Sequence, residues 1–245
     1  MKRLILILLL LPFVNTFASG GSEHLEQAQA NIRSKESLIN GAKYYMSYCS
    51  SCHSLQYQRY SRMAQDLGLT KEEVEENLIF TGAKFTDHIT NNMSAADAEK
   101  WFGKAPPDLT VIAKARGVDW IYTYLKSFYK DPTRPSGWNN TLFVGASMPN
   151  VFWKEQGVQE AHFEEHTSSD GVVTHSFKEF TKLSQGTMSD EEFNETVRDV
   201  VNFLAYTAEP AQLIRMAYAP WVLLFLVIFT FMAYLLKKNY FKDIH

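Results

Sequence analysis

Apolar residues recur at helical spacing along most of this 245-residue chain, whereas the strict alternation typical of strands is rare. The first regular run begins at about Ser37, and its apolar positions are three or four residues apart: Ala42, Tyr45, Met46 and Cys49. This spacing puts an apolar stripe on one face of a helix. We therefore predict a helix that begins near Ser37 and leads directly into the first cysteine.

Two later helices are marked by a capping box at their start. Thr70 precedes Glu73 by three residues, and Ser189 precedes Glu192 in the same way. In such a box each side chain bonds the backbone N–H of the other residue. The helix after Ser189 also carries a long apolar stripe: Phe193, Val197, Val200, Val201 and Leu204. We predict that it is the last helix before the C-terminal segment, from which Pro210 separates it.

The middle of the chain mixes helical and irregular stretches. Residues 117–131 place apolar side chains on one helical face, and Pro132 is expected to end that helix: Ile121, Tyr124, Leu125 and Phe128. Prolines and glycines crowd residues 131–160, so we expect mostly loop there. Strand signals are weak apart from one suggested hairpin around the turn pair Asp170-Gly171. The predicted fold class is mainly α.

The two ends of the chain differ from the middle. Residues 1–18 combine a basic start, a short apolar run and small residues, which is typical of a secretory signal peptide, with cleavage expected after Ala18. Residues 216–236 hold no charge, and at about 1.5 Å per residue they reach across a bilayer core of about 30 Å. Lys237, Lys238 and Lys242 follow, which favours a cytoplasmic C-terminus.

These features divide the chain into five parts. We expect a signal peptide at 1–18, a loosely ordered lead-in at 19–36, an exported domain at 37–210, a transmembrane helix at 216–236 and a cytoplasmic tail at 237–245. The location predicted is a bacterial inner membrane crossed once, with the domain in the periplasm. We expect membrane and protein partners and no nucleic acid.

Charge is concentrated in one segment of the exported domain. Residues 155–195 hold ten acidic residues and two lysines, a net of −8, so the rest of the chain is +5 and the total is −3. One interpretation is a solvated acidic face. The other is a docking surface for a basic partner, because complementary fields speed encounter.

The chain contains only two cysteines, in the motif C-x-x-C-H formed by Cys49, Cys52 and His53. This is the attachment signature of a c-type haem, in which two thioethers fix the porphyrin and the histidine coordinates iron. A thioredoxin-like dithiol would lie in a βαβ pattern, which is missing here, and a zinc site would need a second pair of ligands. We predict one covalent haem c, with His53 as the proximal iron ligand.

The residue opposite His53 decides between electron transfer and an open, reactive iron. A methionine there raises the reduction potential and closes the iron to substrates. Met148 lies in the downstream loop "VGASMPNVFW", which Pro149 stiffens, and it is the favoured candidate. Met188, in the approach to the last helix of the domain, is the alternative, and either methionine could instead only fill a gap in the core.

Several longer stretches resemble the bacterial cytochrome c1 family, the haem subunit of the cytochrome bc1 (ubiquinol–cytochrome c reductase) complex. They are "YCSSCHSLQY", "FGKAPPDLTVIAKARGVDWIYTYLKSFY", "RPSGWNN", "SMPNVFW", "GTMSDEEF" and "VVNFLAYTAEP". The resemblance implies a c-type haem domain with Met148 as the distal ligand. It also implies that Pro106, Pro107 and Arg116 line the haem, with Arg116 near a propionate.

By this resemblance the chain carries single electrons from a Rieske iron–sulfur protein to a c-type cytochrome, within a complex that also contains cytochrome b. The enzyme activity, quinol–cytochrome c reduction, would belong to the complex, and the chain needs no bond-making catalytic residue of its own. Two alternatives are a stand-alone membrane-anchored cytochrome c that serves an oxidase or peroxidase, and a haem enzyme or sensor with an open iron. A third signal, "HFEEH" at 162–166, fits an inverted zinc-protease motif, but we expect a polar surface loop there.

Overall fold

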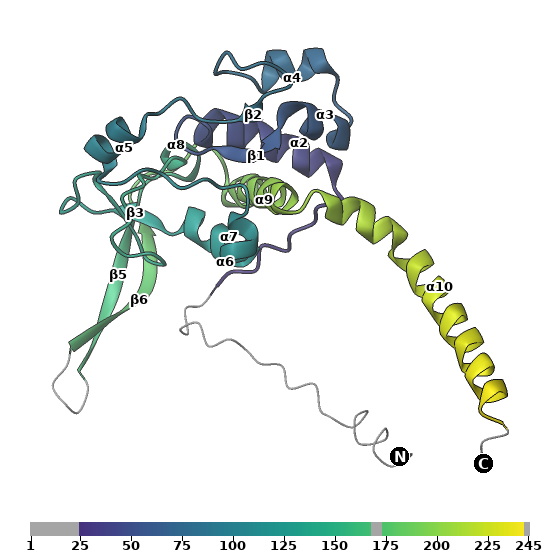
Figure 1. The fold of residues 1–245 in the computed structure, drawn as a ribbon. Coiled ribbons are helices and arrows are strands. Elements are labelled where there is room, and N and C mark those ends of the chain that lie inside the picture. The colour runs from purple at the N-terminus through teal and green to yellow at the C-terminus, as the bar shows by residue number, and fades with distance from the viewer. Residues whose placement is uncertain (1–24, 168–172, 243–245) are drawn as a thin grey trace.

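The protein is described here by a computed structural model that covers residues 25–167 and 173–242 (Figure 1). The expected signal peptide, the turn pair Asp170-Gly171 and the last three residues lie outside this description. The described helices are α2 (Lys35–Tyr44), a π-helix η1 (Tyr45–Cys49), α3 (Tyr60–Leu67), α4 (Lys71–Asn77), α5 (Ala95–Phe102), α6 (Ile112–Arg116), α7 (Val118–Lys126), α8 (Trp153–Gln156), α9 (Asp190–Ala208) and α10 (Ala211–Tyr240).

The strands are short and form only antiparallel pairs within the described ranges. They are β1 (Leu55–Arg59) with β2 (His88–Ile89), β3 (Phe128–Lys130) with β4 (Trp138–Asn140), and β5 (Gln159–Thr167) with β6 (Val173–Lys182). The helices therefore carry most of the regular structure. The prediction of a mainly α fold is confirmed.

The core of the domain is built where α2 crosses α9. Gly41 lies so close to α9 that a Cβ at this position would overlap the backbone carbonyl of Asp199. Tyr45 packs on Phe203 with ring centroids 5.6 Å apart, and both side chains are fully buried. The stripe predicted on α9 is buried as a whole: Phe193, Val197, Val200, Val201 and Leu204. This crossing supports the helix that ends at Cys49.

Both predicted capping boxes are present. The Thr70 side chain accepts from the N–H of Glu73 and the Ser189 side chain from the N–H of Glu192, and each glutamate bonds back to its cap. The first helix begins two residues earlier than predicted, at Lys35, because Ser34 serves as its N-cap. The cap residues thus fix where these helices start.

Helix α7 ends earlier than predicted. It ends at Lys126 rather than at Pro132, and Phe128 begins β3. The Ser127 hydroxyl donates to the carbonyl of Thr123 at 2.6 Å and closes the last turn. Phe128 is still buried, and its ring meets that of Tyr124 edge-on with centroids 5.0 Å apart.

The hairpin β5–β6 is longer than the weak strand signals suggested. Nine residues of β5 pair with β6, and a register shift lies between His162 and Phe163. On one face three phenylalanines form an edge-to-face and tilted series: Phe163, Phe177 and Phe180. Figure 1 shows that the hairpin projects away from the helices. Acidic and histidine residues between the aromatics hid this alternation in the sequence.

The described part of the lead-in is ordered, in contrast to the expectation for residues 19–36. Ala28 is fully buried, and its N–H donates to the carboxylate of Asp119 at 2.8 Å. The N–H of Asn31 donates to the side chain of Asn202 at 2.7 Å. These bonds tie an irregular segment to α7 and α9.

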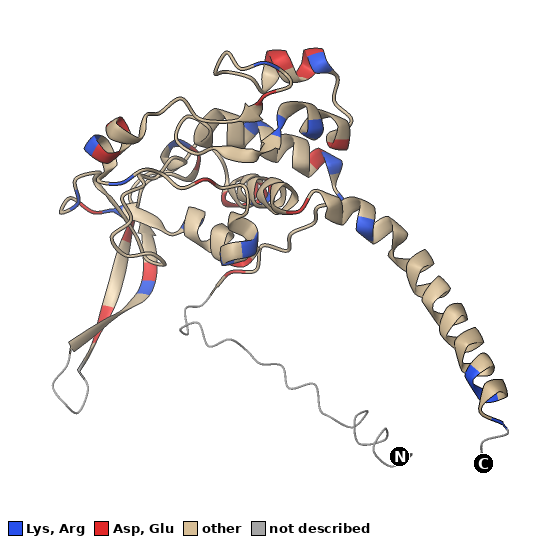
Figure 2. Ribbon diagram, in the orientation of Figure 1, with Lys and Arg blue, Asp and Glu red and all other residues tan. Residues whose placement is uncertain are grey.

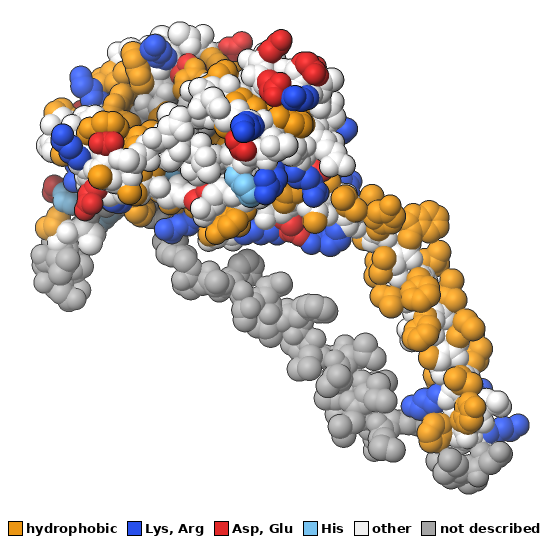
Figure 3. Space-filling view, turned by 45° about the horizontal axis from the view of Figure 1, so that its top comes forward, with side chains coloured by type: hydrophobic (Ala, Val, Ile, Leu, Met, Phe, Trp, Pro, Cys, Tyr) orange, Lys and Arg blue, Asp and Glu red, His pale blue; other side chains and the backbone are white. Residues whose placement is uncertain are grey.

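Helix α10 leaves the domain as a single exposed rod. It begins at Ala211, five residues before the predicted span, and it contains Pro220. It is the one helix in the described ranges that is long and apolar enough to cross a membrane, and none of its most apolar stretch is buried. Figure 3 shows hydrophobic side chains along most of α10, and Figure 2 shows basic residues near its two ends. Arg215 lies in the first turns of the helix, and Lys237 and Lys238 lie in its last turn. This helix is suited to anchor the domain in a membrane.

Candidate functional site

The cysteine motif lies in a tight turn at the end of η1. The N–H groups of Cys52 and His53 both donate to the carbonyl of Cys49, at 3.0 and 2.9 Å. The Ser50 hydroxyl donates to the carbonyl of Met46 at 2.7 Å. Cys49 is buried and Cys52 is half-buried, and both are free cysteines. The turn therefore gathers two sulfurs and an imidazole within five residues.

The ring of His53 is oriented by a residue from another part of the chain. Its Nδ1 lies 2.7 Å from the carbonyl oxygen of Pro107. A carbonyl only accepts hydrogen bonds, so Nδ1 carries the proton and Nε2 keeps a free lone pair. Such an outer partner is what fixes the tautomer and orientation of a metal-binding histidine. Pro107, predicted to line the site, thus contacts the predicted proximal ligand directly.

Burial shifts the pKa values of two side chains in the motif, His53 and Cys49. Burial lowers the pKa of His53, against the opposing effects of the Pro107 carbonyl and the Asp108 carboxylate, so the ring is neutral at physiological pH. Burial, helped by the charge on Cys52, raises the pKa of Cys49 to about 12. A neutral imidazole with a free Nε2 is the form that binds a metal.

Several residues that the sequence did not single out hold this turn in place. The Tyr45 hydroxyl donates to the carbonyl of His53 at 2.8 Å. The Asn91 side chain donates to the carbonyl of Cys52, and the Asn91 N–H donates to the Ser54 hydroxyl at 2.9 Å. Asn91 is 39 residues away from Cys52 and belongs to no motif, so no sequence signal could have found it.

Met148 lies on a different segment and is held through its sulfur. The Tyr124 hydroxyl of α7 donates to the Met148 Sδ at 3.6 Å. Met148 is partly buried and packs against the same core that includes Cys49. Met188, the alternative, instead accepts a hydrogen bond from the Thr196 hydroxyl of α9 at 3.6 Å. Both methionines pack against this core, and only the hydrogen-bond donors of their sulfurs differ.

A direct contact joins the cysteine helix to the segment after Met148. The Tyr48 hydroxyl donates to the carboxylate of Glu155 on α8 at 2.6 Å, and the Tyr48 ring lies 5.1 Å from that of Phe152. The bond to Glu155 is the main cause that raises the pKa of Tyr48 to about 12. Glu155 is buried, so it does not contribute to the acidic surface proposed for residues 155–195.

Arg116 and Pro106 are placed less directly. The Arg116 guanidinium lies 5.1 Å over the ring of Trp120, which stacks on Tyr124 with centroids 5.0 Å apart. Arg116 is exposed and thus belongs to the Met148 side of the site through these two rings. Pro106 is half-buried beside Pro107, and no hydrogen bond or aromatic contact of its own is found in the described structure.

The donor set and its surroundings fit a haem. Two thiols, one imidazole with a free Nε2 and one thioether are the chemical groups that c-type haem attachment and His/Met ligation require. Several apolar side chains pack against the core that includes Cys49 yet stay partly exposed: Leu109, Ile112, Tyr124, Met148 and Val151. The N–H of Leu109 donates to the carbonyl of Ser54, next to His53, at 2.9 Å. Half-covered side chains of this kind would offer apolar surface to a porphyrin.

The histidines of "HFEEH" do not form a metal site. They lie on strand β5, where His162 bonds the Thr181 hydroxyl at 3.0 Å and His166 bonds the Ser176 hydroxyl at 2.9 Å. Four residues along a strand span about 13 Å, too far for two ligands of one zinc ion. The segment is exposed, as predicted, but it is a strand and not a loop. Among described residues, no cluster of three or more His, Cys, Asp or Glu could hold a metal ion.

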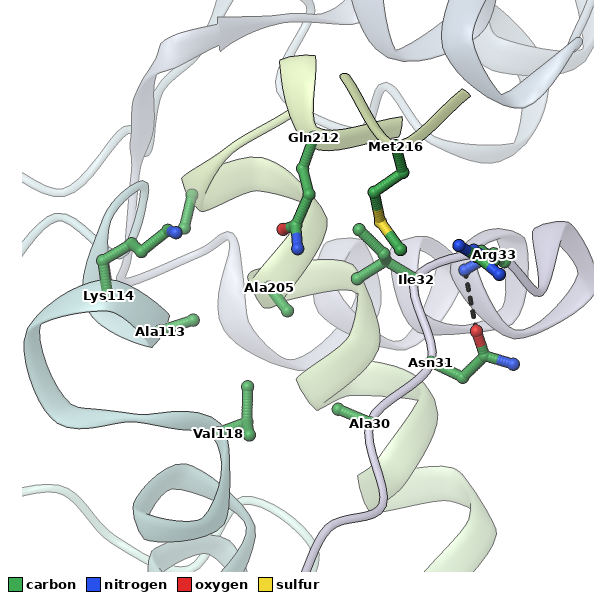
Figure 4. A pocket seen from close by; sticks show the side chains of 11 residues that line it. Ala30, Asn31, Ile32, Arg33, Ala113, Lys114, Val118, Ala205, Gln212 and Met216 are labelled. Atoms are coloured by element: carbon green, nitrogen blue, oxygen red, sulfur yellow. Dashed lines mark hydrogen bonds between the residues drawn. The ribbon is translucent and has the colours of Figure 1, made fainter. Parts of the chain in front are cut away.

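A cavity of about 500 Å³ lies elsewhere, at the junction with α10. Figure 4 shows Ile32 and Met216 on one side of it and Lys114 on the other. It is lined by the lead-in, α6, the start of α7, α9 and the first turns of α10, and by neither cysteine nor Met148. This cavity is therefore separate from the candidate site.

Comparison with known proteins shows the family to which the chain belongs. Residues 30–244 match the model of the Cytochrome C1 family. The chain is 49% identical to "Cytochrome c1" of Allochromatium vinosum, with 100% of both chains covered. It is 40% identical to "Ammonia monooxygenase gamma subunit" of Nitrosomonas europaea, over 100% of this chain and 98% of that one. It is 29% identical to "Cytochrome c1, heme protein, mitochondrial" of Neurospora crassa, over 71% of this chain and 52% of that one. The chain belongs to the cytochrome c1 family, whose members are c-type haem proteins.

Proposed function

We propose that this chain is the electron-carrying subunit of a bc1 complex, in which it takes single electrons from a Rieske iron–sulfur protein and passes them to a c-type cytochrome. The observation that carries the proposal is the His53 imidazole, held by the Pro107 carbonyl directly after the two cysteines. Membership of the cytochrome c1 family, the haem subunit of this complex, supports it. Quinol–cytochrome c reduction would then be an activity of the complex.

In this proposal four residues hold the haem. Cys49 and Cys52 would bind it covalently through thioethers, and His53 Nε2 and Met148 Sδ would coordinate its iron. A haem held in this way supplies reversible one-electron chemistry at its iron. His53 is kept neutral and oriented by its surroundings, and Met148 is kept in place by Tyr124. An iron that takes both of these ligands from the chain would be suited to electron transfer rather than to substrate binding.

The remaining predicted residues shape the edge of the site. Pro107 orients His53, and Pro106 stiffens the approach to it, because proline fixes φ. We infer that Arg116 pairs with a propionate, since it is exposed beside Trp120 at the end of α6 and a guanidinium suits a carboxylate. Together these residues would set how the haem edge meets solvent and partners.

The acidic hairpin is a candidate docking surface for the electron acceptor. Glu160, Glu164, Glu165 and Glu179 lie exposed on it. Lys178 pairs with Glu164 at 2.8 Å, and His175 Nδ1 lies 3.8 Å from the carboxylate of Glu165. Figure 2 shows these charges along the projecting strands. A basic c-type cytochrome would approach such a surface faster at low salt. A turnover rate that is insensitive to ionic strength would count against this role.

We propose that α10 anchors the domain with its head on the periplasmic side of a bacterial inner membrane and its C-terminus in the cytoplasm. Lys237 and Lys238 at one end outnumber Arg215 at the other, as the positive-inside rule requires. A cytochrome domain so tethered stays next to its electron donor. Both partners, the cytochrome b and Rieske subunits, would share the same membrane.

The experiment that tests the proposal is purification of the tagged full chain from solubilised membranes, followed by quinol reduction of the bound haem. We expect cytochrome b and a Rieske protein to co-purify, and we expect added quinol to reduce the covalent haem in a step that needs both partners. A chain that purifies alone, and is reduced by an unrelated donor at an unchanged rate, would instead support the stand-alone anchored cytochrome.

A further inference from the structure

We propose that Tyr124 is a positioning residue for the Met148 sulfur, and that its hydrogen bond raises the reduction potential of the site. The inference rests on the proposed function, in which Met148 is the distal ligand. It adds a residue from outside every haem motif, at the centre of α7. The geometry of three contacts carries it.

The first contact is the hydrogen bond itself. The Tyr124 hydroxyl donates to the Met148 Sδ at 3.6 Å, a normal length for a bond to sulfur. A thioether is a weak acceptor. Three other tyrosines of the core donate to oxygen: Tyr45 to the His53 carbonyl, Tyr48 to Glu155 and Tyr206 to Asp66. Tyr124 differs from them in serving a sulfur.

The second set of contacts holds the Tyr124 ring. Trp120 stacks on it at 5.0 Å between centroids with planes 10° apart, and Phe128 meets it edge-on at 5.0 Å and 69°. Rings packed on two sides cannot swing without opening the core. The hydroxyl therefore keeps its direction toward the sulfur without depending on the weak bond for its own orientation.

The third contact ties the backbone of Tyr124 to the loop that carries Met148. The buried Asn140 side chain donates to the Tyr124 carbonyl at 2.8 Å. The oxygen of the same side chain accepts from the N–H groups of Leu142 and Phe143, each at 3.0 Å. One side chain thus holds both the helix residue and the start of the loop. The backbone of Tyr124 and the loop that leads to Met148 are thus fixed relative to each other.

A donor on the thioether draws electron density away from the sulfur lone pairs. The sulfur then becomes a poorer donor to oxidised iron, which depends on that density more than reduced iron does. Hydrogen bonds to axial ligands are among the ways in which a protein sets a haem potential. The Tyr124 hydroxyl should therefore favour the reduced state and raise the potential.

The test compares Tyr124→Phe with Tyr122→Phe by redox titration of the covalent haem in the whole membrane complex. Tyr122 is a buried tyrosine of the same helix, two residues away and thus on another face. We expect Tyr124→Phe to shift the reduced-to-oxidised ratio by up to about fivefold toward the oxidised form, or ~40 mV at 59 mV per tenfold. We expect Tyr122→Phe to leave the potential unchanged.

A second variant tests the direction of the effect without removing a side chain. Fluorotyrosine at position 124 makes the hydroxyl a stronger donor at nearly constant shape, so the potential should rise. The same replacement at Tyr122 is the control. If neither change at Tyr124 moves the potential, or if the changes at Tyr122 move it equally, the inference is overturned.

The outcomes also separate this inference from the proposed function. If the wild-type oxidised protein lacks methionine–iron absorption, Met148 is not the ligand and both proposals fail. If that absorption is present but the potential ignores Tyr124, only the positioning role fails. If Tyr124→Phe keeps the methionine–iron absorption and lowers the reduction potential, both the proposed function and the positioning role of Tyr124 are supported.

Discussion

The two sides of the candidate haem site are built in different ways. On the His53 side, both sulfurs and the imidazole lie within five consecutive residues, and the turn at the end of η1 sets their arrangement. On the Met148 side, the sulfur, the hydroxyl that holds it and the amide that fixes the loop come from residues 148, 124 and 140. Local chain geometry makes the first side, and packing between distant segments makes the second.

This difference predicts that changes on the His53 side affect covalent attachment of the haem, whereas changes on the Met148 side affect its reduction potential. The largest effect should come from replacing Cys49 and Cys52 together by alanine. Without thioether bonds no haem can survive denaturation. We expect complete loss of peroxidase staining of the chain after denaturing electrophoresis, with Ser51→Ala as a control that keeps the stain. A stained band in the double variant would contradict covalent attachment at this motif.

Met148→Leu should retain the stain but lose the sulfur ligand. Axial ligands set haem potentials over about 0.8 V, so we expect the potential to fall by roughly 0.1 V or more. The reduced protein should also bind carbon monoxide, because the distal position is open. The matched control is Met188→Leu, whose sulfur bonds Thr196 instead. If the potential falls in Met188→Leu and not in Met148→Leu, then Met188 and not Met148 is the sulfur ligand of the iron.

Tyr48→Phe should weaken the connection between the two sides. The change leaves the buried Glu155 carboxylate without its donor, and one of its oxygens already lacks a partner within the described structure. Leaving such a group unsatisfied costs about 1–3 kcal/mol, or several degrees in Tm at about 2–4 °C per kcal/mol.

The measurement is thermal unfolding followed by the haem spectrum. Tyr44→Phe is the control, because its ring lies 6.2 Å from Tyr48 and no hydrogen bond of its hydroxyl is found in residues 25–167 and 173–242. An equal Tm for both variants would mean that the Tyr48–Glu155 bond does not join the two sides.

Replacing the cap residues should have the smallest effects on stability. The two capping boxes should also differ, because one caps a core helix and the other a peripheral helix. Ser189→Ala removes the cap of α9, which carries the core stripe, and should lower the global unfolding free energy by about 1 kcal/mol. Thr70→Ala affects the seven-residue α4 and should appear mainly as faster local hydrogen exchange. Equal losses of global stability would contradict this division.

The same boxes predict a dependence on pH. Backbone and hydroxyl hydrogen bonds from Ser189 lower the pKa of Glu192 in the folded protein. A lowered folded pKa means that the stabilisation is complete above the ordinary glutamate pKa and is lost as the pH falls through the folded value. We therefore expect Glu192→Gln to flatten the acid side of the stability curve slightly. An acid limb that is unchanged would show that Glu192 does not contribute to it.

The contrast between the two sides also explains what could be predicted from the sequence. The cysteine motif, the apolar span of α10 and both capping boxes depend on neighbouring residues, and they were read directly from the chain. Met148 was singled out from its loop, and the resemblance to the family strengthened it. Tyr124 was predicted only as one residue of an apolar helix face.

What was missed depends on contacts between distant segments. Nothing near Asn91 signals that it reaches Cys52, and nothing near Asn140 signals that it holds Tyr124. The end of α7 was placed too late because Phe128 continues the helical spacing while lying in a strand. Short-range patterns predict which side chains are buried, but not whether a helix or a strand carries them.

The most direct test of the central claim is the near-infrared and visible absorption of the oxidised protein in wild type, Met148→Leu and Met188→Leu. The account predicts methionine–iron absorption in the wild type and in Met188→Leu, and its loss in Met148→Leu. If the absorption persists after Met148 is replaced, the two sides of the haem are not held by His53 and Met148.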